Sequence, residues 1–497
     1  LFRSHILAEM IHRWSHDAEM QVRACHVIWA FTSGSSRSDA EPFEPDVMMV
    51  MHRLIEAEIP TAVTNAIGKF PQDRALFAAG LKAVASLSAL SRARETFASS
   101  QLIMPLVSGM VLFQVDRDIQ QIGLSTIIQL LRHGNVVMPE LINQGVCKLV
   151  HKVMLTFPND NHLLVRSFDV VKQLASDPTA REKFRADGAC KTLVQQLERY
   201  LDNRDMLNYV LESIHRLSVD DTTNIIQFSK ARICQALRQV VHTKKFNSGL
   251  AQRICDVMIA LCGVPENRDK LGQEGFCEVV VTFLQHYRHL PDILIGSLKA
   301  TYHLAVWNGD NQRKLGEAGC CEAAQHALLV SPDTPELVEH ALIVFHVLAF
   351  DGLNRSTLGR IEAHDLVISA MNRYFDDVAV QKRGIKTLWT MALNHPTNRQ
   401  LIGYSSGCET ILRAFDKYKS DQRLAAAAIS AIQQLALGVD NQQQLASNDT
   451  LFRLLSAAIQ QYIDFNDVHG LRSAMETCVV VVWDHKDALL TFTEWGG

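Results

Sequence analysis

Apolar and polar positions recur along this chain with a period of 43 or 44 residues. The clearest markers are five asparagines, each followed four residues later by Leu or Ile: Asn267 with Leu271, Asn311 with Leu315, Asn354 with Leu358, Asn398 with Ile402 and Asn441 with Leu445. Similar spacing, with one interval of 42 residues, continues toward the N-terminus and gives starts at Met51, Ala93, Val137, Ala180 and Asn224, with the apolar position kept at Ile55, Phe97, Leu141, Phe184 and Phe228. Such a period predicts a repeat architecture in which each unit packs against its neighbours.

Each unit has the pattern of a short helix, a longer helix, a polar turn and a third amphipathic helix. A glycine recurs where the chain leaves the first helix, at Gly145, Gly188, Gly275 and Gly319, and glycine favours the left-handed conformation that ends many helices. Pro332 and Asp333 mark one of the turns. The third helix ends on an apolar residue that is usually followed by a small one, as at Leu304 and Ala305, which allows neighbouring helices to approach closely.

This three-helix unit resembles the armadillo repeat. The resemblance rests on the Asn-x3-Leu marker, on the glycine four residues further on, and on third helices such as residues 380–392. It covers residues 51–486 and implies an all-α fold, a right-handed α-α superhelix (solenoid) of about ten to eleven three-helix repeats. HEAT repeats have a similar period with two helices and remain the alternative, although the glycine after a separate first helix favours armadillo.

The repeat spacing also predicts the domain organisation. Residues 1–50 are expected to form a partial N-terminal repeat with an inserted loop at residues 34–46, which is rich in Ser, Pro and acidic residues. Ten repeats then span residues 51–486, with starts near 51, 93, 137, 180, 224, 267, 311, 354, 398 and 441, and residues 487–497 are a C-terminal tail.

Composition narrows the class of protein. The 497 residues are 47% hydrophobic and 21% charged, which is typical of a folded domain. Lys and Arg total 49 against 53 Asp and Glu, so the basic excess of a nucleic-acid-binding protein is missing. The longest apolar run, residues 102–115, is too short to cross a membrane. The chain lacks an initiator Met, from which we expect a fragment of a longer polypeptide or a processed product.

Cysteines and histidines do not form a recognisable site in the sequence. Six of the eleven cysteines share one offset in their units: Cys147, Cys190, Cys234, Cys277, Cys321 and Cys408. Equivalent positions in stacked repeats should lie roughly 10 Å apart, about one helix diameter, whereas a disulfide needs Cα atoms within about 7 Å. We therefore expect buried, reduced thiols and a cytoplasmic location. His12 and His16 share a helical face but lack a third metal ligand.

Motifs of nucleotide-binding and hydrolytic enzymes are missing from the sequence, including GxGxxG, Walker-type Gly-Lys-Ser/Thr, HExxH and GxSxG. The sequence therefore predicts neither a catalytic site nor a bound cofactor or metal.

In armadillo stacks the third helices line a concave groove, so the resemblance implies that their exposed positions bind the partner. Nuclear-import receptors of this family repeat a Trp and an Asn there; neither array is present, which argues against nuclear-signal binding. What remains is a mixed polar stripe with aromatic and planar groups beside it. The candidate residues of a protein-binding groove are Asp169, Glu212, Arg216, Asp256, Lys299, His303, Lys386 and Trp389. Charges directed at solvent, and Trp389 packed between repeats, are the alternative interpretation.

The resemblance implies a non-catalytic scaffold that holds an extended peptide or a protein surface along the groove. Family precedents include cytoskeletal and ciliary scaffolds. Alternatives are the regulatory arm of a larger enzyme, a regulator of small GTPases and, less favoured, a sensor of nucleotide metabolites. We expect protein or peptide partners, no nucleic acid and no transmembrane segment.

Overall fold

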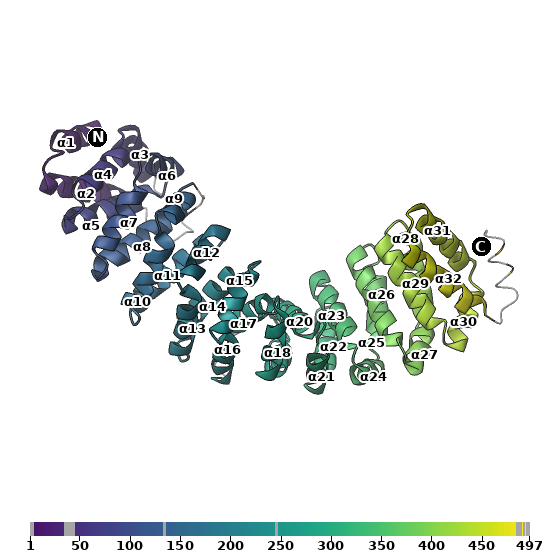
Figure 1. Ribbon diagram of the computed structural model, residues 1–497. Helices are drawn as coiled ribbons and strands as arrows, with labels where there is room; N and C mark the ends of the chain where they lie inside the picture. The colour runs from purple at the N-terminus through teal and green to yellow at the C-terminus, as the bar shows by residue number, and fades with distance from the viewer. Residues whose placement is uncertain are drawn as a thin grey trace. The chain divides into compact units, whose positions relative to one another are not determined.

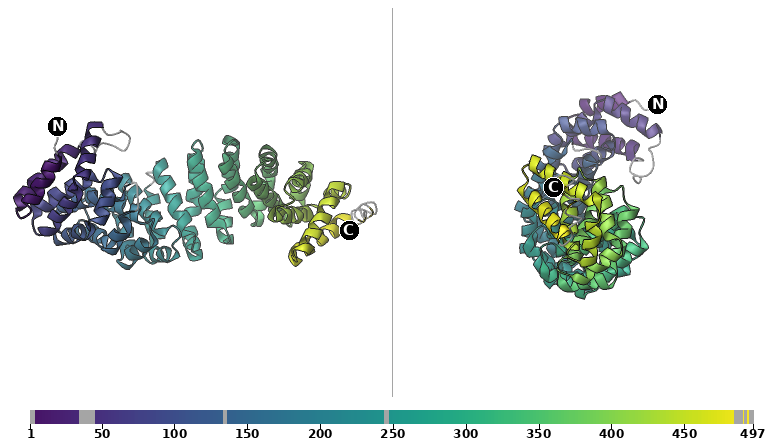
Figure 2. Two further views of the ribbon diagram at one scale, coloured as in Figure 1. Left: turned by 90° about the horizontal axis from the view of Figure 1, so that it is seen from above. Right: turned by 90° about the vertical axis from the view of Figure 1, so that its right-hand side faces the viewer.

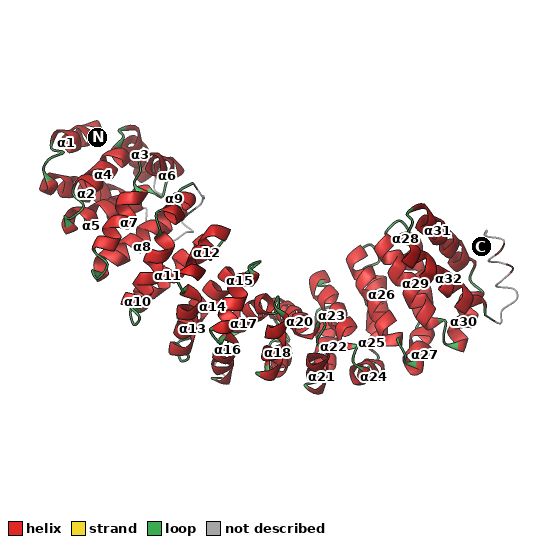
Figure 3. Ribbon diagram, viewed as in Figure 1, coloured by secondary structure: helices red, strands yellow, loops and turns green. Residues whose placement is uncertain are grey.

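The computed structural model of this protein describes residues 4–33, 45–132, 136–243, 247–483, 490 and 493. These residues form 32 helices and no strand (Figure 3). From α3 onward the helices follow in threes, and from α6 onward each triplet consists of a short helix, a longer second helix and a third helix, as the sequence pattern predicts. The all-α helical repeat fold expected from the sequence is confirmed. None of these helices combines the length and the apolar character that crossing a bilayer requires.

The chain divides into two compact units, of which the first spans Leu1–Thr243. In this unit the third helices α2, α5, α8, α11 and α14 pack side by side in one layer, and the second helices α4, α7, α10, α13 and α16 pack in another. Its helices, in chain order (Figure 1), are α1 (Ser4–Arg13), α2 (Ala18–Thr32), α3 (Pro45–Glu56), α4 (Ile59–Lys69), α5 (Arg74–Leu87), α6 (Ser91–Ser99), α7 (Ile103–Leu112), α8 (Arg117–Leu131), α9 (Met138–Asn143), α10 (Val146–Thr156), α11 (Asn161–Leu174), α12 (Pro178–Ala186), α13 (Ala189–Arg199), α14 (Arg204–Ser218), α15 (Thr222–Lys230) and α16 (Ile233–His242).

The second unit spans Lys244–Gly497. Its third helices α17, α20, α23, α26, α29 and α32 form one layer, in which each helix contacts the next, and its triplets follow one another in chain order (Figure 1, Figure 2). The helices are α17 (Ser248–Leu261), α18 (Pro265–Gln273), α19 (Phe276–His286), α20 (Pro291–Ala305), α21 (Gly309–Glu317), α22 (Cys320–Val330), α23 (Pro335–Leu348), α24 (Gly352–Arg360), α25 (Ala363–Arg373), α26 (Val378–Ala392), α27 (Pro396–Tyr404), α28 (Gly407–Lys417), α29 (Gln422–Leu435), α30 (Val439–Ala446), α31 (Asp449–Asp464) and α32 (Val468–Val482).

The turns identified in the sequence cap these helices. Asp377 precedes α26 and its carboxylate accepts hydrogen bonds from the backbone N–H groups of Ala379 and Val380, which satisfies two donors that the first helical turn leaves unpaired. Gly188 precedes α13 with a φ of 90°, in the left-handed region where a Cβ would be strained. The helix boundaries therefore follow from local chemistry that the sequence contains.

The repeated asparagines join each triplet to the one before it. The Nδ2 of Asn311 in α21 donates to the carbonyl of Leu304 at the end of α20, at 3.0 Å, and to the carbonyl of Arg268 in α18, at 2.9 Å. Asn398 makes the same pair of bonds to Met391 and Arg355. These asparagines are buried. Each amide thus bonds to a carbonyl at the end of the preceding third helix and to a carbonyl in the first helix of the preceding triplet.

The core consists of apolar side chains at the positions that the period predicts, such as Phe184, Phe228 and Leu315, all fully buried. The predicted inserted loop lies outside the described residues as far as residue 44, and α3 begins at Pro45. The predicted tail lies outside them apart from residues 490 and 493. The division into ten repeats with the stated starts stays a prediction.

Candidate functional site

Helix α26 of the second unit carries two of the residues that the sequence singles out, Lys386 and Trp389. A Cβ at Gly384 would overlap the side chain of Met371, so this side of α26 lies tightly against α25. The Thr387 hydroxyl donates to the carbonyl of Leu342 at 2.9 Å, which fixes α26 against α23. Lys386 and Trp389 are three residues apart and share the opposite, outward side of the helix.

The ammonium of Lys386 lies in a positive environment. Its side chain is exposed and forms no ion pair with any residue that the structure describes. The pKa of Lys386 is lowered, first by partial desolvation and then by the positive charges of its neighbours Arg383, Lys382 and Arg423. We call the surface formed by these four cations and Trp389 the α26 face.

Part of this positive charge is already paired. Arg383 Nε lies 3.3 Å from Glu339 Oε1 on α23, and Lys382 Nζ lies 2.6 Å from Asp421 Oδ2 at the start of α29. Lys386 forms no such pair with any described residue, so its side chain is available to a ligand. An anionic group placed beside Lys386 would meet an attractive field from the whole α26 face.

Aromatic rings lie next to Lys386. The ring of Trp389 lies 6.4 Å from His346 and 6.3 Å from Phe350, and His346 and Phe350 are 5.3 Å apart, all measured between ring centroids. Phe350 is 43% exposed, and Trp389 is half-buried. Such a cluster offers apolar area to an approaching side chain, and aromatic residues of this kind dominate binding energy at interfaces.

His346 fixes this arrangement. Its Nδ1 lies 3.1 Å from the carbonyl oxygen of Lys386, so the Nδ1–H tautomer donates to that carbonyl. Burial lowers the pKa of His346 to about 4. The imidazole is therefore neutral at physiological pH and adds no charge to the α26 face.

Lys299 and His303 on α20 are less available. Lys299 Nζ pairs with Glu336 Oε1 at 2.7 Å, and the ammonium lowers the pKa of that carboxyl. His303 is half-buried, its ring meets Tyr302 edge-on at 5.2 Å, and burial lowers its pKa. Neither residue presents an uncompensated charge comparable with that of Lys386.

The acidic residues of the predicted stripe are each matched by a cation on their own helix. In the first unit, Asp169 lies 3.5 Å from Lys172. Glu212 is only 8% exposed and accepts from Arg216 at 2.8 Å.

In the second unit, Asp256 pairs with Arg253 at 3.2 Å and also accepts from the amide of Gln252. These carboxylates are therefore neutralised locally. Of the eight predicted groove residues, Lys386 and Trp389 lie together on the α26 face, where Lys386 forms no ion pair with any described residue.

The cysteines and the histidine pair behave as structural residues. All eleven cysteines are free and buried, as the sequence analysis expects, and burial raises the pKa of Cys147 and Cys190 to about 12. His16 contacts the ammonium of Lys69 through its Nδ1, at 2.9 Å. No three potential metal ligands come together within the described part of the chain.

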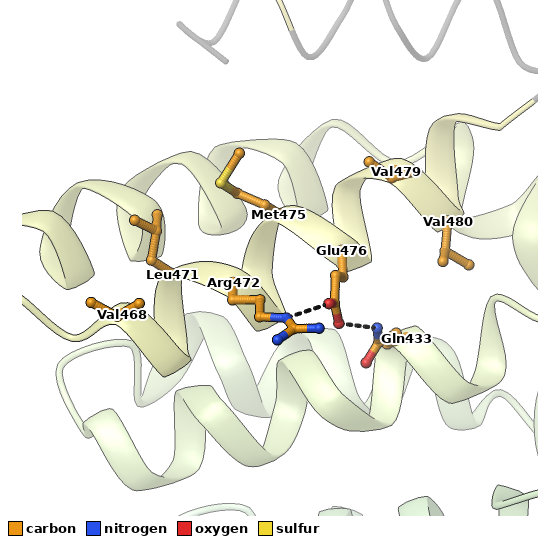
Figure 4. A pocket seen from close by; sticks show the side chains of 8 residues that line it. All are labelled: Gln433, Val468, Leu471, Arg472, Met475, Glu476, Val479 and Val480. Atoms are coloured by element: carbon orange, nitrogen blue, oxygen red, sulfur yellow. Dashed lines mark hydrogen bonds and ion pairs between the residues drawn. The ribbon is translucent and has the colours of Figure 1, made fainter.

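A second exposed surface lies on α32, near the C-terminal end of the second unit. Figure 4 shows Leu471, Met475 and Val479 in a row along this helix, beside a pocket of about 560 Å³. Met475 and Val479 are both 55% exposed. The polar contacts here stay within the chain, since Glu476 accepts from Arg472 and from Gln433. This surface is apolar and lacks the charge of the α26 face.

Solved structures share this fold. A chain from a structural study of a phosphorylation switch in the interaction between cadherin and beta-catenin aligns with 99% of this chain and 93% of its own length, with a TM-score of 0.75 and 16% identity. An engineered protein aligns with 88% of this chain and all of its own length, with a TM-score of 0.74 and 15% identity. A designed armadillo repeat protein aligns with 52% of this chain, with a TM-score of 0.41. No family model and no curated protein sequence matches the chain.

The protein therefore has an armadillo-type helical repeat fold, as the resemblance in the sequence implies. At this level of identity the likeness defines the fold alone, and function has to be argued from the residues of this chain.

Proposed function

We propose that this protein is a non-catalytic scaffold whose α26 face binds an extended, acidic segment of a partner protein. The observation that carries the proposal is the exposed Lys386 ammonium, unpaired among the described residues, beside three further cations and next to the half-buried Trp389. The pairing of each candidate acidic residue with a cation on its own helix supports an acidic rather than a basic partner.

The fold gives this proposal its geometry. Third helices that pack side by side present equivalent positions at regular spacing, which suits a ligand in extended conformation. Carboxylates of the ligand would pair with Lys386 and its neighbouring cations, and an apolar side chain would pack on Trp389 and Phe350. The structural neighbour from the study of cadherin and beta-catenin is consistent with a role in protein binding.

The test is a binding titration with a short, fluorescein-labelled peptide rich in Glu and Leu. Lys386→Glu should weaken binding by about tenfold or more, because it places a carboxylate opposite the ligand's own. Trp389→Ala should weaken binding by a similar factor, about that of an aromatic hot spot. Because Lys386 is exposed and has no ion-pair partner among the described residues, its reversal should leave the circular dichroism spectrum unchanged.

The matched control is Lys148→Glu, the same charge change at an exposed lysine of α10 in the first unit. It should leave the affinity within about twofold of the wild type, since Lys148 is not part of the α26 face. Equal binding by the wild type and Lys386→Glu would exclude the α26 face as the site.

A further inference from the structure

A basic pocket lies in the first unit, among α12, α13, α15 and α16, which pack on one another. It has a volume of about 530 Å³, within the range of small-ligand sites. Four cationic side chains line it, Arg185, Lys191, Lys230 and Arg232, against a single carboxylate, Glu198. The pocket therefore carries a local excess of positive charge in a chain whose net charge is −4.

Three of these cations have no counter-ion within the described residues. Arg185 is compensated, since its Nη1 lies 3.5 Å from Asp221 Oδ1 and donates to Asn224 Oδ1 at 3.1 Å. Lys191, Lys230 and Arg232 are exposed and form no ion pair with any residue that the structure describes. Like charges that share one pocket repel each other, and an anion between them would relieve this repulsion.

Two second helices of the first unit, α10 with Lys148 and α13 with Lys191, differ at one position from four second helices of the second unit. In four second helices of the second unit, α19, α22, α25 and α28, the first turn carries an acidic residue at one shared offset: Glu278, Glu322, Asp365 and Glu409. These carboxylates complement the positive end of the helix dipole. In α13 the same position is Lys191, and the first turn contains no acidic residue. The helix start thus adds to the positive charge of the side chains, and Glu198 is the one carboxylate among the lining residues.

We propose that this pocket binds a phosphate monoester. A phosphate group carries a charge of about −1.5 to −2 and three acceptor oxygens, so it can neutralise several cations at once, whereas a carboxylate can neutralise only one. The guanidinium fork of Arg232 and the ammonium groups of Lys191 and Lys230 are the charged donors. The amides of Gln195 and Gln227, which also line the pocket, can hydrogen-bond the group that carries the phosphate.

Isothermal titration calorimetry of the full chain tests the site with three probes: a short phosphoserine peptide, the same peptide with serine, and inorganic phosphate. The phosphoserine peptide should bind at least about tenfold more tightly than its serine counterpart. Tighter binding of the phosphopeptide than of inorganic phosphate would assign the site to a phosphorylated protein. Equal binding of the two would assign it to small phosphate compounds. Both results support the pocket.

Lys191→Glu is the decisive variant, because it installs the residue found at the same offset in α19, α22 and α28 and should therefore fold normally. It should weaken phosphopeptide binding at least about tenfold, and Arg232→Ala should weaken it as well. Lys148→Glu, at the same offset in the neighbouring α10 but outside the pocket lining, is the control and should weaken binding clearly less than Lys191→Glu does.

Two results would overturn the proposal: equal affinity for the phosphorylated and unphosphorylated peptides, or equal losses in Lys191→Glu and Lys148→Glu. The pocket and the α26 face lie in different units, so either can fail without the other.

Discussion

His346 is a buried titratable group beside the proposed binding face, and its protonation links pH to stability. Burial holds the folded-state pKa of His346 at about 4, compared with an ordinary value of 6.5. Below pH 6.5 the unfolded chain therefore binds a proton that the folded chain does not. Protonation of the unfolded chain lowers the free energy of unfolding. The contribution of the neutral His346 to stability is therefore complete above pH 6.5 and is lost as the pH falls from 6.5 to about 4.

We predict that His346→Gln removes part of the acid sensitivity of the protein. Because the folded and unfolded states bind protons differently, the pKa of His346 should lower the unfolding free energy of the wild type by about 3 kcal/mol when the pH falls from 7.5 to 4. The measurement is urea denaturation of both proteins at several pH values. The difference between their free energies of unfolding at each pH separates the effect of His346 from that of the other buried histidines. Parallel pH profiles for the two proteins would contradict the assignment of a low pKa to His346.

At the scale of single residues, part of the site was present in the sequence and part was not. The ion pairs that neutralise Asp169 and Glu212 use partners three and four residues away on the same helix, Lys172 and Arg216, and this spacing is visible without a structure. The field at Lys386 is different, because Arg423 lies on another helix, α29, and only the packing of α29 on α26 brings the two together.

At the scale of helices, the repeated Asn and Gly residues together form a contact between the first helices of successive triplets. Gly316 in α21 faces Asn354 in α24, and a Cβ at Gly316 would overlap the Asn354 Oδ1. Asn354 in turn donates to the carbonyl of Gln312 at 2.7 Å. The glycine thus lets the first helices of successive triplets approach closely enough for the amide to bridge them. The sequence shows this contact as a recurring Asn-x4-Gly pattern, as in Asn311 and Gly316. The sequence alone does not show what the pattern does, because the Asn and Gly that meet belong to different repeats.

We predict that Gly316→Ala destabilises the protein even though alanine is the better helix former by about 1 kcal/mol. The overlap with Asn354 should cost about 1 to 3 kcal/mol, measured as a shift in the urea midpoint. Gly352→Ala serves as the control, since its Cβ would meet no atom within 4 Å.

A double-mutant cycle with Asn354→Ala separates the two contributions to this contact. Asn354→Ala alone should cost about 1 to 3 kcal/mol, because it removes the buried hydrogen bond to the carbonyl of Gln312. The double variant should be less destabilised than the sum of the single variants, because the overlap is removed. Strict additivity would show that the two residues do not meet.

At the scale of the whole molecule, the period of 43 or 44 residues predicted the class of fold, because each repeat carries its own complete set of turn, core and bridging residues. The binding surfaces were less predictable. The sequence identified Lys386 by its offset and Trp389 as an aromatic residue beside it, but the pocket of Lys191 and Arg232 requires the packing of four helices. The sequence indicated this pocket only through Lys191, which stands in α13 at the position where α19, α22, α25 and α28 have an acidic residue.

The salt dependence of peptide binding tests whether the basic α26 face attracts an acidic ligand. The chain is acidic overall, so a Glu-rich ligand is repelled at long range and attracted only by a local basic surface. We predict that its affinity falls as salt is raised, because screening weakens attraction between exposed charges. The dependence should be shallower for Lys386→Glu. An affinity that rises with salt would show that repulsion by the whole molecule outweighs any basic face.

The most direct test of whether the α26 face binds acidic peptides is a selection from a random peptide display library against the wild-type chain and against Lys386→Glu. The proposed acidic-peptide site on the α26 face predicts that peptides bound by the wild type are enriched in Asp and Glu together with large apolar residues. It also predicts that Lys386→Glu loses these peptides, while Lys148→Glu retains them. Enrichment of basic or uncharged peptides, or the same acidic peptides from wild type and Lys386→Glu alike, would contradict the proposal that the α26 face is the binding site.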